Sequence, residues 1–198
     1  PQLRISFEGS NRAQQNTMKG VQQGSYISIM LVFSLLALQF RSYLQPIIVM
    51  SAIPFGIVGA VMGHYLLGFT LSIVSVLGMV ALSGIVVNDS LIMVDFINRF
   101  REEGHRLREA ILEAGVRRFR PIVLTTLTTF FGLMPMMFET SRQARFLIPM
   151  AISLAFGVLF ATFITLVLVP VFYYLLNDFL VLFGQKKRDV LDKTATAD

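Results

Sequence analysis

The chain contains no cysteine and few charged side chains. Of its 198 residues, 15% are charged and 55% are hydrophobic, and residues 42–88, a stretch of 47, hold no Asp, Glu, Lys or Arg. The absence of cysteine excludes disulfide bonds and thiolate metal sites within the chain. The shortage of charge, together with a mean hydropathy of +0.68, lies outside the range of ordinary soluble domains and indicates a membrane protein.

Long uncharged runs predict the membrane spans. One helix crosses the hydrocarbon layer in about 20 residues, so the run of 47 residues needs two helices, with a turn near Gly68 and Thr70. In the second span, Gly59 and Gly63 form a pair at GxxxG spacing, which predicts close packing against another helix. We therefore expect an all-α membrane protein with five transmembrane helices, at residues 24–40, 46–66, 70–98, 121–138 and 147–176.

Polar segments flank and connect these spans. Residues 1–23 are interpreted as the end of an extramembrane domain leading to the first helix, with a short strand in LRISF. Residues 99–120 place apolar side chains at helical spacing, which predicts either an amphipathic helix on the membrane surface or a solvated connector. Residues 178–198 are expected to form a polar tail.

The distribution of Lys and Arg predicts the orientation. Twelve basic residues follow the first, third and fifth spans, and five lie on the other side. Since basic residues in short loops are retained in the cytoplasm, we expect the N-terminus in the periplasm and the C-terminus in the cytoplasm. The basic excess is thus explained by topology and contact with membrane lipids, and nucleic acid is not an expected partner.

The third span carries polar residues in the segment GIVVNDSLIMVDF. Asp89 lies ten residues before Arg99, or about 15 Å along a helix, where an ionised carboxylate costs about 2.5 to 3.5 kcal/mol on insertion scales. Two interpretations stay open: Asn88, Asp89 and Ser90 form an interhelical hydrogen-bond cluster around a neutral Asp89, or Asp89 titrates in an aqueous path through a transporter. Asp95 is nearer the end of the span, where an arginine can neutralise it.

The fourth span carries a stripe of threonines. Thr125 and Thr129 are four residues apart and share one helix face. Such a stripe can carry water or protons, but threonine hydroxyls in membrane helices also bond to their own backbone. The stripe alone therefore does not establish a function.

Several motifs in a fixed order carry a family resemblance. LALQFRSYLQPIIVMSAIPFGIVGA, GIVVNDSLIMVDF, RFRPIVLTT and LVPVFYYL resemble the C-terminal membrane half of resistance-nodulation-division (RND) multidrug efflux transporters of the hydrophobe/amphiphile type. The resemblance implies the last five of twelve helices in a bacterial inner-membrane drug/proton antiporter, a secondary transporter and not an enzyme. It also implies partners, namely the N-terminal half, a homotrimer, a periplasmic adaptor and an outer-membrane channel. The energy source would be the proton motive force, without a cofactor or metal.

The resemblance further implies a proton relay in which the centre of the third span faces two acidic residues of the first half. The positions that match this relay are Asn88, Asp89, Thr125 and Arg118. Well-studied members carry Lys at the position of Asn88. The amide of Asn88 cannot supply a positive charge, and Asp89 replaces what is commonly Asn. Secondary polar candidates are Ser90, Asp95 and Thr129.

Two other functions compete with that of an exporter. An intramembrane aspartyl protease needs two facing carboxylates from adjacent helices, whereas Asp89 and Asp95 lie on one helix, about 240° apart. This geometry excludes the protease. A structural or protein-export-assisting membrane subunit of the same superfamily stays open as the alternative, and a protein-export assay separates it from an exporter.

Overall fold

The computed structural model describes the backbone of residues 8–182 and the side chains of residues 12–141 and 144–176. Within this part of the chain all regular structure is helical, as expected from the sequence. The expected strand in LRISF and the end of the polar tail lie outside the described residues. The helices are α1 (Glu8–Phe40), α2 (Gln45–Met50), α3 (Ile53–Leu67), α4 (Ile73–Glu102), α5 (Leu107–Met137) and α6 (Arg142–Leu182).

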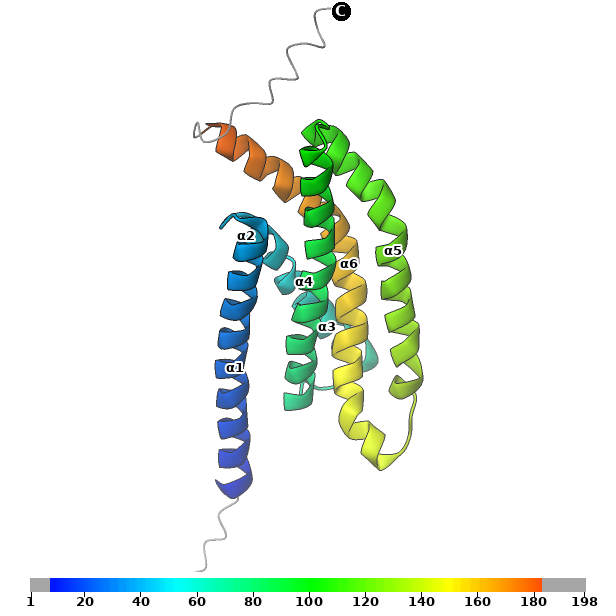
Figure 1. The fold of residues 1–198 in the computed structure, drawn as a ribbon. Coiled ribbons are helices and arrows are strands. Elements are labelled where there is room, and N and C mark those ends of the chain that lie inside the picture. The colour runs from blue at the N-terminus through cyan, green and yellow to red at the C-terminus, as the bar shows by residue number, and fades with distance from the viewer. Residues whose placement is uncertain (1–7, 183–198) are drawn as a thin grey trace, which may run out of the picture.

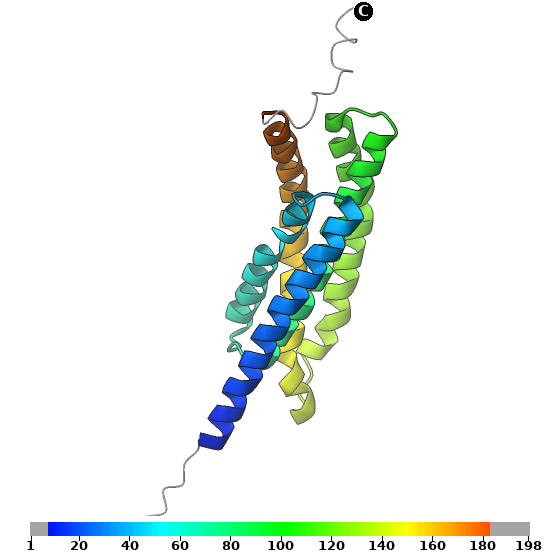
Figure 2. The same cartoon turned by 60° about the vertical axis from the view of Figure 1, so that its left-hand side comes forward.

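α6 is the central element of the bundle. It packs against α3, α4 and α5, whereas α1 contacts mainly α2 and α4. Figures 1 and 2 show α3, α4 and α5 around α6, with α1 at the edge of the bundle. The apolar side chains Met30, Leu35 and Leu38 on α1 are 72%, 65% and 75% exposed, so this helix presents a wide apolar surface to whatever surrounds the bundle.

The expected second span is divided by a short break. α2 ends at Met50 and α3 begins at Ile53, and each has a proline in its first turn. A proline has no N–H to continue a helix but fits the first turn, where that N–H has no partner. Pro54 therefore explains why one span consists of two helices, while residues Gln45–Leu67 together keep the length and hydropathy of a membrane span.

The turn between α3 and α4 lies where the sequence predicts it. α3 ends before Gly68, whose φ of +69° is in the left-handed region that favours glycine. α4 begins at Ile73, three residues later than expected, because Ser72 caps it: the Ser75 N–H donates to Ser72 Oγ at 3.2 Å, and the Ser72 N–H donates to Ser75 Oγ at 3.1 Å.

The connector between the third and fourth spans differs from expectation. Residues 99–120 do not form a separate surface helix or a loop, because α4 extends to Glu102 and α5 starts at Leu107 and continues to Met137. Leu107, Ala110 and Ala114 are buried in the core beside Ile97 and Tyr173. The apolar stripe of the connector thus packs inside the bundle, where the small alanines allow close approach.

Among the described residues, four helical segments are long and apolar enough to span a membrane: Arg12–Phe40, Gln45–Leu67, Ile73–Glu102 and Ala144–Leu176. α5, the remaining expected span, has charged residues throughout its first part, and its uncharged part begins only after Arg120. It nevertheless packs along α6 (Figure 1). The chain therefore has the architecture of a multi-pass membrane bundle.

Close contact between α3 and α6 depends on glycine. A Cβ atom added to Gly59 would lie 2.4 Å from Phe160 Cβ and 2.8 Å from the Phe156 carbonyl oxygen, and one added to Gly63 would lie 2.5 Å from Phe156 Cβ. Contacts this short force the helices apart. The GxxxG pair therefore has the packing role that its spacing predicts.

Replacing Gly59 by alanine is expected to destabilise the intact transporter by about 1 to 3 kcal/mol, since the added methyl group overpacks the contact. The matched control is Gly132→Ala, because a Cβ atom at Gly132 meets nothing within 4 Å. Thermal unfolding in detergent measures both variants. Equal melting temperatures for the two would contradict this assignment.

Candidate functional site

The polar triplet Asn88, Asp89 and Ser90 lies in the middle of α4. Glu102, at the end of the helix, is 13 residues beyond Asp89, or about 20 Å at about 1.5 Å per residue. The three side chains fan around the helix, because successive residues are rotated by about 100°. Asn88 is exposed, Asp89 is half-buried and Ser90 is fully buried.

Ser90 is unusual among the buried hydroxyls. Its Oγ atom has no hydrogen-bond partner among the described residues, although serine hydroxyls in helices commonly bond to a carbonyl one turn earlier. A buried polar atom without a partner costs about 1 to 3 kcal/mol. Ser90 is therefore a buried hydroxyl that lacks, within the described part of the chain, the hydrogen bond that buried polar atoms usually make.

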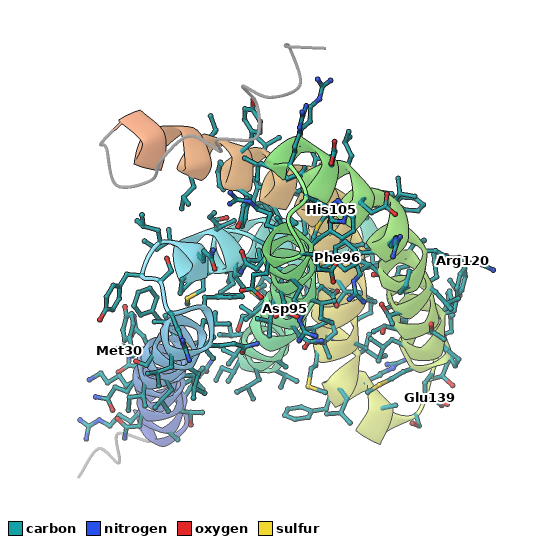
Figure 3. All side chains as sticks on the ribbon, turned by 45° about the horizontal axis from the view of Figure 1, so that its top comes forward. Met30, Asp95, Phe96, His105, Arg120 and Glu139 are labelled. Carbon is teal, nitrogen blue, oxygen red and sulfur yellow. The ribbon has the colours of Figure 1, made fainter. Side chains whose placement is uncertain are left out.

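Asp95 occupies a different environment from Asp89. Its Oδ2 atom lies 3.0 Å from Arg99 Nε, one helical turn later, in a partly exposed ion pair. Asp95 also lines a polar cavity at the end of the bundle, to which α1 and α2 contribute residues; Figure 3 shows it on α4 beside those helices. The arginine partner expected from the sequence is thus present.

Thr125 and Thr129 bond to their own helix. Thr125 Oγ1 donates to the Ile122 carbonyl at 2.8 Å, and Thr129 Oγ1 donates to the Thr125 carbonyl at 2.9 Å. Thr125 is exposed on α5. The hydroxyl groups of Thr125 and Thr129 thus donate to the backbone of their own helix. Among the described residues, no hydrogen bond joins Thr125 to the triplet on α4.

Thr126, which is not among the site residues predicted from the sequence, makes an interhelical hydrogen bond from α5 to α6. Its hydroxyl lies 2.7 Å from that of Thr162 on α6, and both residues are buried. Phe130, one turn later, packs edge-on against Phe156 with ring centres 5.5 Å apart. The spacing of Ile122, Thr126 and Phe130 by four residues is the signal that identifies this inward face.

Arg118 lies near the end of the bundle, away from the centre of α4. Its guanidinium carbon is 5.1 Å from the centre of the Phe96 ring, a cation–π contact between α5 and α4. Its Nε atom is buried without a hydrogen-bond partner among the described residues. Phe96 stacks on Phe100, which stacks on His105 (Figure 3). Arg118 therefore completes a mainly aromatic contact where α4 turns into α5.

Two polar networks connect the helices through side chains that are not among the residues predicted from the sequence. Asn98 on α4 exchanges amide hydrogen bonds of 2.9 and 3.1 Å with Gln45 on α2, and it accepts a bond of 2.6 Å from the Tyr173 hydroxyl on α6. At the opposite end, the fully buried Ser75 meets His64. Asn98 carries the clearest sequence signal, as an amide one residue before Arg99 in a mostly apolar helix.

His64 is held in one orientation by two hydrogen bonds. Its Nδ1 atom lies 2.9 Å from the Ala60 carbonyl oxygen, and its Nε2 atom lies 2.8 Å from Ser75 Oγ. Because a carbonyl can only accept, Nδ1 carries a hydrogen and donates it to Ala60. Ser153 on α6 donates to the Ser75 carbonyl at 3.0 Å. This network ties α3, α4 and α6 together.

No group of three or more His, Cys, Asp or Glu side chains that could hold a metal ion occurs in the described part of the chain. The arrangement as a whole is a helical bundle of membrane spans whose interhelical polar groups are mostly paired, with a half-buried carboxylate beside an unpaired hydroxyl in one long span. It defines the chain as part of a multi-pass membrane protein.

Residues 1–177 match the AcrB/AcrD/AcrF family. The chain belongs to this family of RND efflux transporters, which are transporters and not enzymes. It is 33% identical over 172 residues to the multidrug resistance protein MdtC of Proteus mirabilis. It is 34% identical over 171 residues to the cobalt-zinc-cadmium resistance protein CzcA of Cupriavidus metallidurans.

These matches cover 86% of this chain but only 17% of MdtC and 16% of CzcA. The chain thus spans about a sixth of the length of these relatives. A crystal structure of a heavy metal efflux pump shares the fold with a TM-score of 0.74 and 29% identity, over 87% of this chain and 17% of that pump. A second crystal form gives a TM-score of 0.63 and 31% identity, over 79% of this chain and 16% of the pump.

The hydrogen bond between Thr126 and Thr162 can be tested by a double-mutant cycle. We expect the changes to valine to be coupled by about 0.6 kcal/mol, and by at most about 1.7 kcal/mol, as for other interhelical bonds in membranes. Unfolding of the intact transporter in detergent supplies the free energies. Thr128→Val is the control partner, since the Thr128 hydroxyl bonds to the Leu124 carbonyl of its own helix. Additive effects of Thr126→Val and Thr162→Val would rule out the coupling.

Proposed function

We propose that this chain forms the last five spans of a twelve-span, proton-coupled RND efflux pump, and that Asp89 takes up and releases the coupled proton. The observation that carries the proposal is the half-buried position of Asp89 in the middle of α4, next to the unpaired hydroxyl of Ser90. A carboxylate at this depth is retained at a cost of about 2.5 to 3.5 kcal/mol on insertion scales. A charged side chain at this depth is therefore expected only where it has a function.

The surroundings of the two aspartates support this choice. Asp95 is neutralised by Arg99 near the end of the helix, whereas no ion pair joins Asp89 to another described residue. A carboxylate without a cationic partner in an apolar span gains and loses a proton more readily than one in an ion pair. Asp89 is therefore the better candidate for proton exchange.

The other relay positions have supporting roles in the proposal. Asn88 is exposed on α4, which supports a contact with the acidic residues that the family resemblance implies on a helix of the first half. Its amide can donate a hydrogen bond to such acids but cannot replace the positive charge of lysine. Thr125 offers an exposed hydroxyl on α5, and Arg118 lies nearer the end of the bundle where the proton would leave.

The cargo is proposed to be an organic drug, as in the hydrophobe/amphiphile branch and as the similarity to a multidrug resistance protein supports. A metal ion is the second candidate, favoured by the similarity to a cobalt-zinc-cadmium resistance protein and to a heavy metal efflux pump. Growth of an efflux-deficient strain carrying the intact pump, on a panel of drugs and of metal salts, distinguishes the two cargo classes.

The proposed setting is the bacterial inner membrane, with the N-terminal end of this segment in the periplasm and the C-terminal end in the cytoplasm. The distribution of Lys and Arg supports this orientation. The intact pump is proposed to form a homotrimer and to work with a periplasmic adaptor and an outer-membrane channel. Cross-linking in cells that express all three components tests this assembly.

Asp89→Asn in the intact pump is expected to abolish proton-driven efflux without loss of expression, because the amide keeps the shape of the side chain but cannot exchange the proton. Accumulation of a fluorescent substrate in de-energised and energised cells measures the effect. Asp95→Asn is the matched control, and it should keep most of the activity. A folded Asp89→Asn pump that retains proton-dependent efflux would refute the role of Asp89.

A further inference from the structure

A polar cavity of about 580 Å³ lies at the end of the bundle where α1 and α4 finish. The end of α1, the start of α2, the last turns of α4 and the turn into α5 form its wall, and α6 contributes one tyrosine. Four positive side chains and two negative ones line it, which leaves an excess of two positive charges. These residues are Arg41, Arg99, Arg101, Arg106, Asp95 and Glu102.

Three uncharged polar residues of the cavity lining are held in place by hydrogen bonds to one another. Asn98, Gln45 and Tyr173 satisfy one another through hydrogen bonds of 2.6 to 3.1 Å. Asp95 is engaged by Arg99 at 3.0 Å, so it offsets a charge that is already paired. The excess of positive charge in the cavity therefore comes from Arg41, Arg101 and Arg106, which Glu102 offsets only in part.

Arg41 has a backbone conformation that favours glycine. Its φ of +50° makes it the one non-glycine residue with a positive φ in the described chain. It follows Phe40, the last residue of α1, at a position where glycine commonly ends a helix without strain. A long cationic side chain is thus kept at a position where it is locally unfavourable, which points to a role for the side chain.

Arg41 lies where two cavities adjoin. It is exposed, and it lines both the polar cavity and a second cavity of about 510 Å³ on α1. Beside it, Tyr43 and Leu38 are 78% and 75% exposed. A cation next to exposed apolar and aromatic groups matches the boundary between lipid headgroups and acyl chains.

The position of the polar cavity along the membrane spans also agrees with the boundary between headgroups and acyl chains. Two candidate membrane spans, Arg12–Phe40 and Ile73–Glu102, end at its wall. Basic pockets between membrane helices bind anionic headgroups, and the guanidinium group matches phosphate oxygens in a bidentate manner. We propose that this cavity binds a phosphate group, either of an anionic phospholipid or of free phosphate, with Arg41 as a principal ligand. The proposal does not depend on proton coupling at Asp89.

The test uses the intact transporter, delipidated and reconstituted in nanodiscs of phosphatidylethanolamine with or without cardiolipin. Native mass spectrometry measures the cardiolipin that stays bound. Arg41→Gln is expected to weaken retention about fivefold, equivalent to about 1 kcal/mol for one surface cation. In a second arm, inorganic phosphate is added to transporter in phosphatidylethanolamine alone, and the shift in melting temperature is measured. A shift there that depends on Arg41 assigns the site to free phosphate, and retention of cardiolipin without such a shift assigns it to a headgroup.

Two further variants separate binding from folding. Arg41→Gly relieves the left-handed backbone, so it should maintain or raise the melting temperature while losing phosphate binding; a merely structural arginine would not lose it. Arg108→Gln removes an exposed arginine in the first turn of α5 that does not line the cavity, and it should bind as the wild type does. The proposal is overturned if both Arg41 variants bind cardiolipin and respond to phosphate normally, or if Arg108→Gln loses as much binding.

Discussion

Close approach of α6 to α3 and α4 is the constraint on which the remaining structure depends. In a membrane there is little hydrophobic drive between helices, so association relies on packing and on hydrogen bonds. Gly59 and Gly63 leave room for Phe160 and Phe156, and Gly157 leaves room for Leu82, where an added Cβ would lie 2.2 Å from Leu82 Cδ2. These glycines bring the backbones near enough for short side chains to bond across the interfaces.

Hydrogen bonds also join α6 to its neighbours α4 and α5. Ser153 reaches the Ser75 carbonyl, and Thr126 reaches Thr162, with side chains that extend only a few ångströms from the backbone. Buried polar groups in these contacts are therefore satisfied, as is expected where no water is available. Against this background, the buried Ser90 Oγ and Arg118 Nε stand out as atoms without a hydrogen-bond partner among the described residues. Asp89 stands out as a half-buried carboxylate in the middle of α4.

Most of the fold could be predicted from the sequence, because the bilayer fixes how long an apolar helix must be. The turn at Gly68 and the packing of the GxxxG pair follow from local chemistry. The break that divides the second span at Pro54 could not be located, since proline tolerates several positions near a helix start. The continuity of α5 could not be predicted either. The apolar stripe at Ala110 and Ala114 has the same spacing whether it meets lipid or protein.

The candidate site was less predictable than the fold, since side-chain partners depend on the rotation of each helix. Thr125 and Thr126 differ by one residue, yet one bonds to its own helix and the other to α6. Likewise, Asn88 is exposed while Asp89 is partly covered. A lysine at position 88 would place its charge on the exposed face, whereas the carboxylate of Asp89 lies about 100° around the helix. Under the proposed function, proton exchange at Asp89 therefore occurs on a side of α4 that is rotated by about 100° from the exposed face of Asn88.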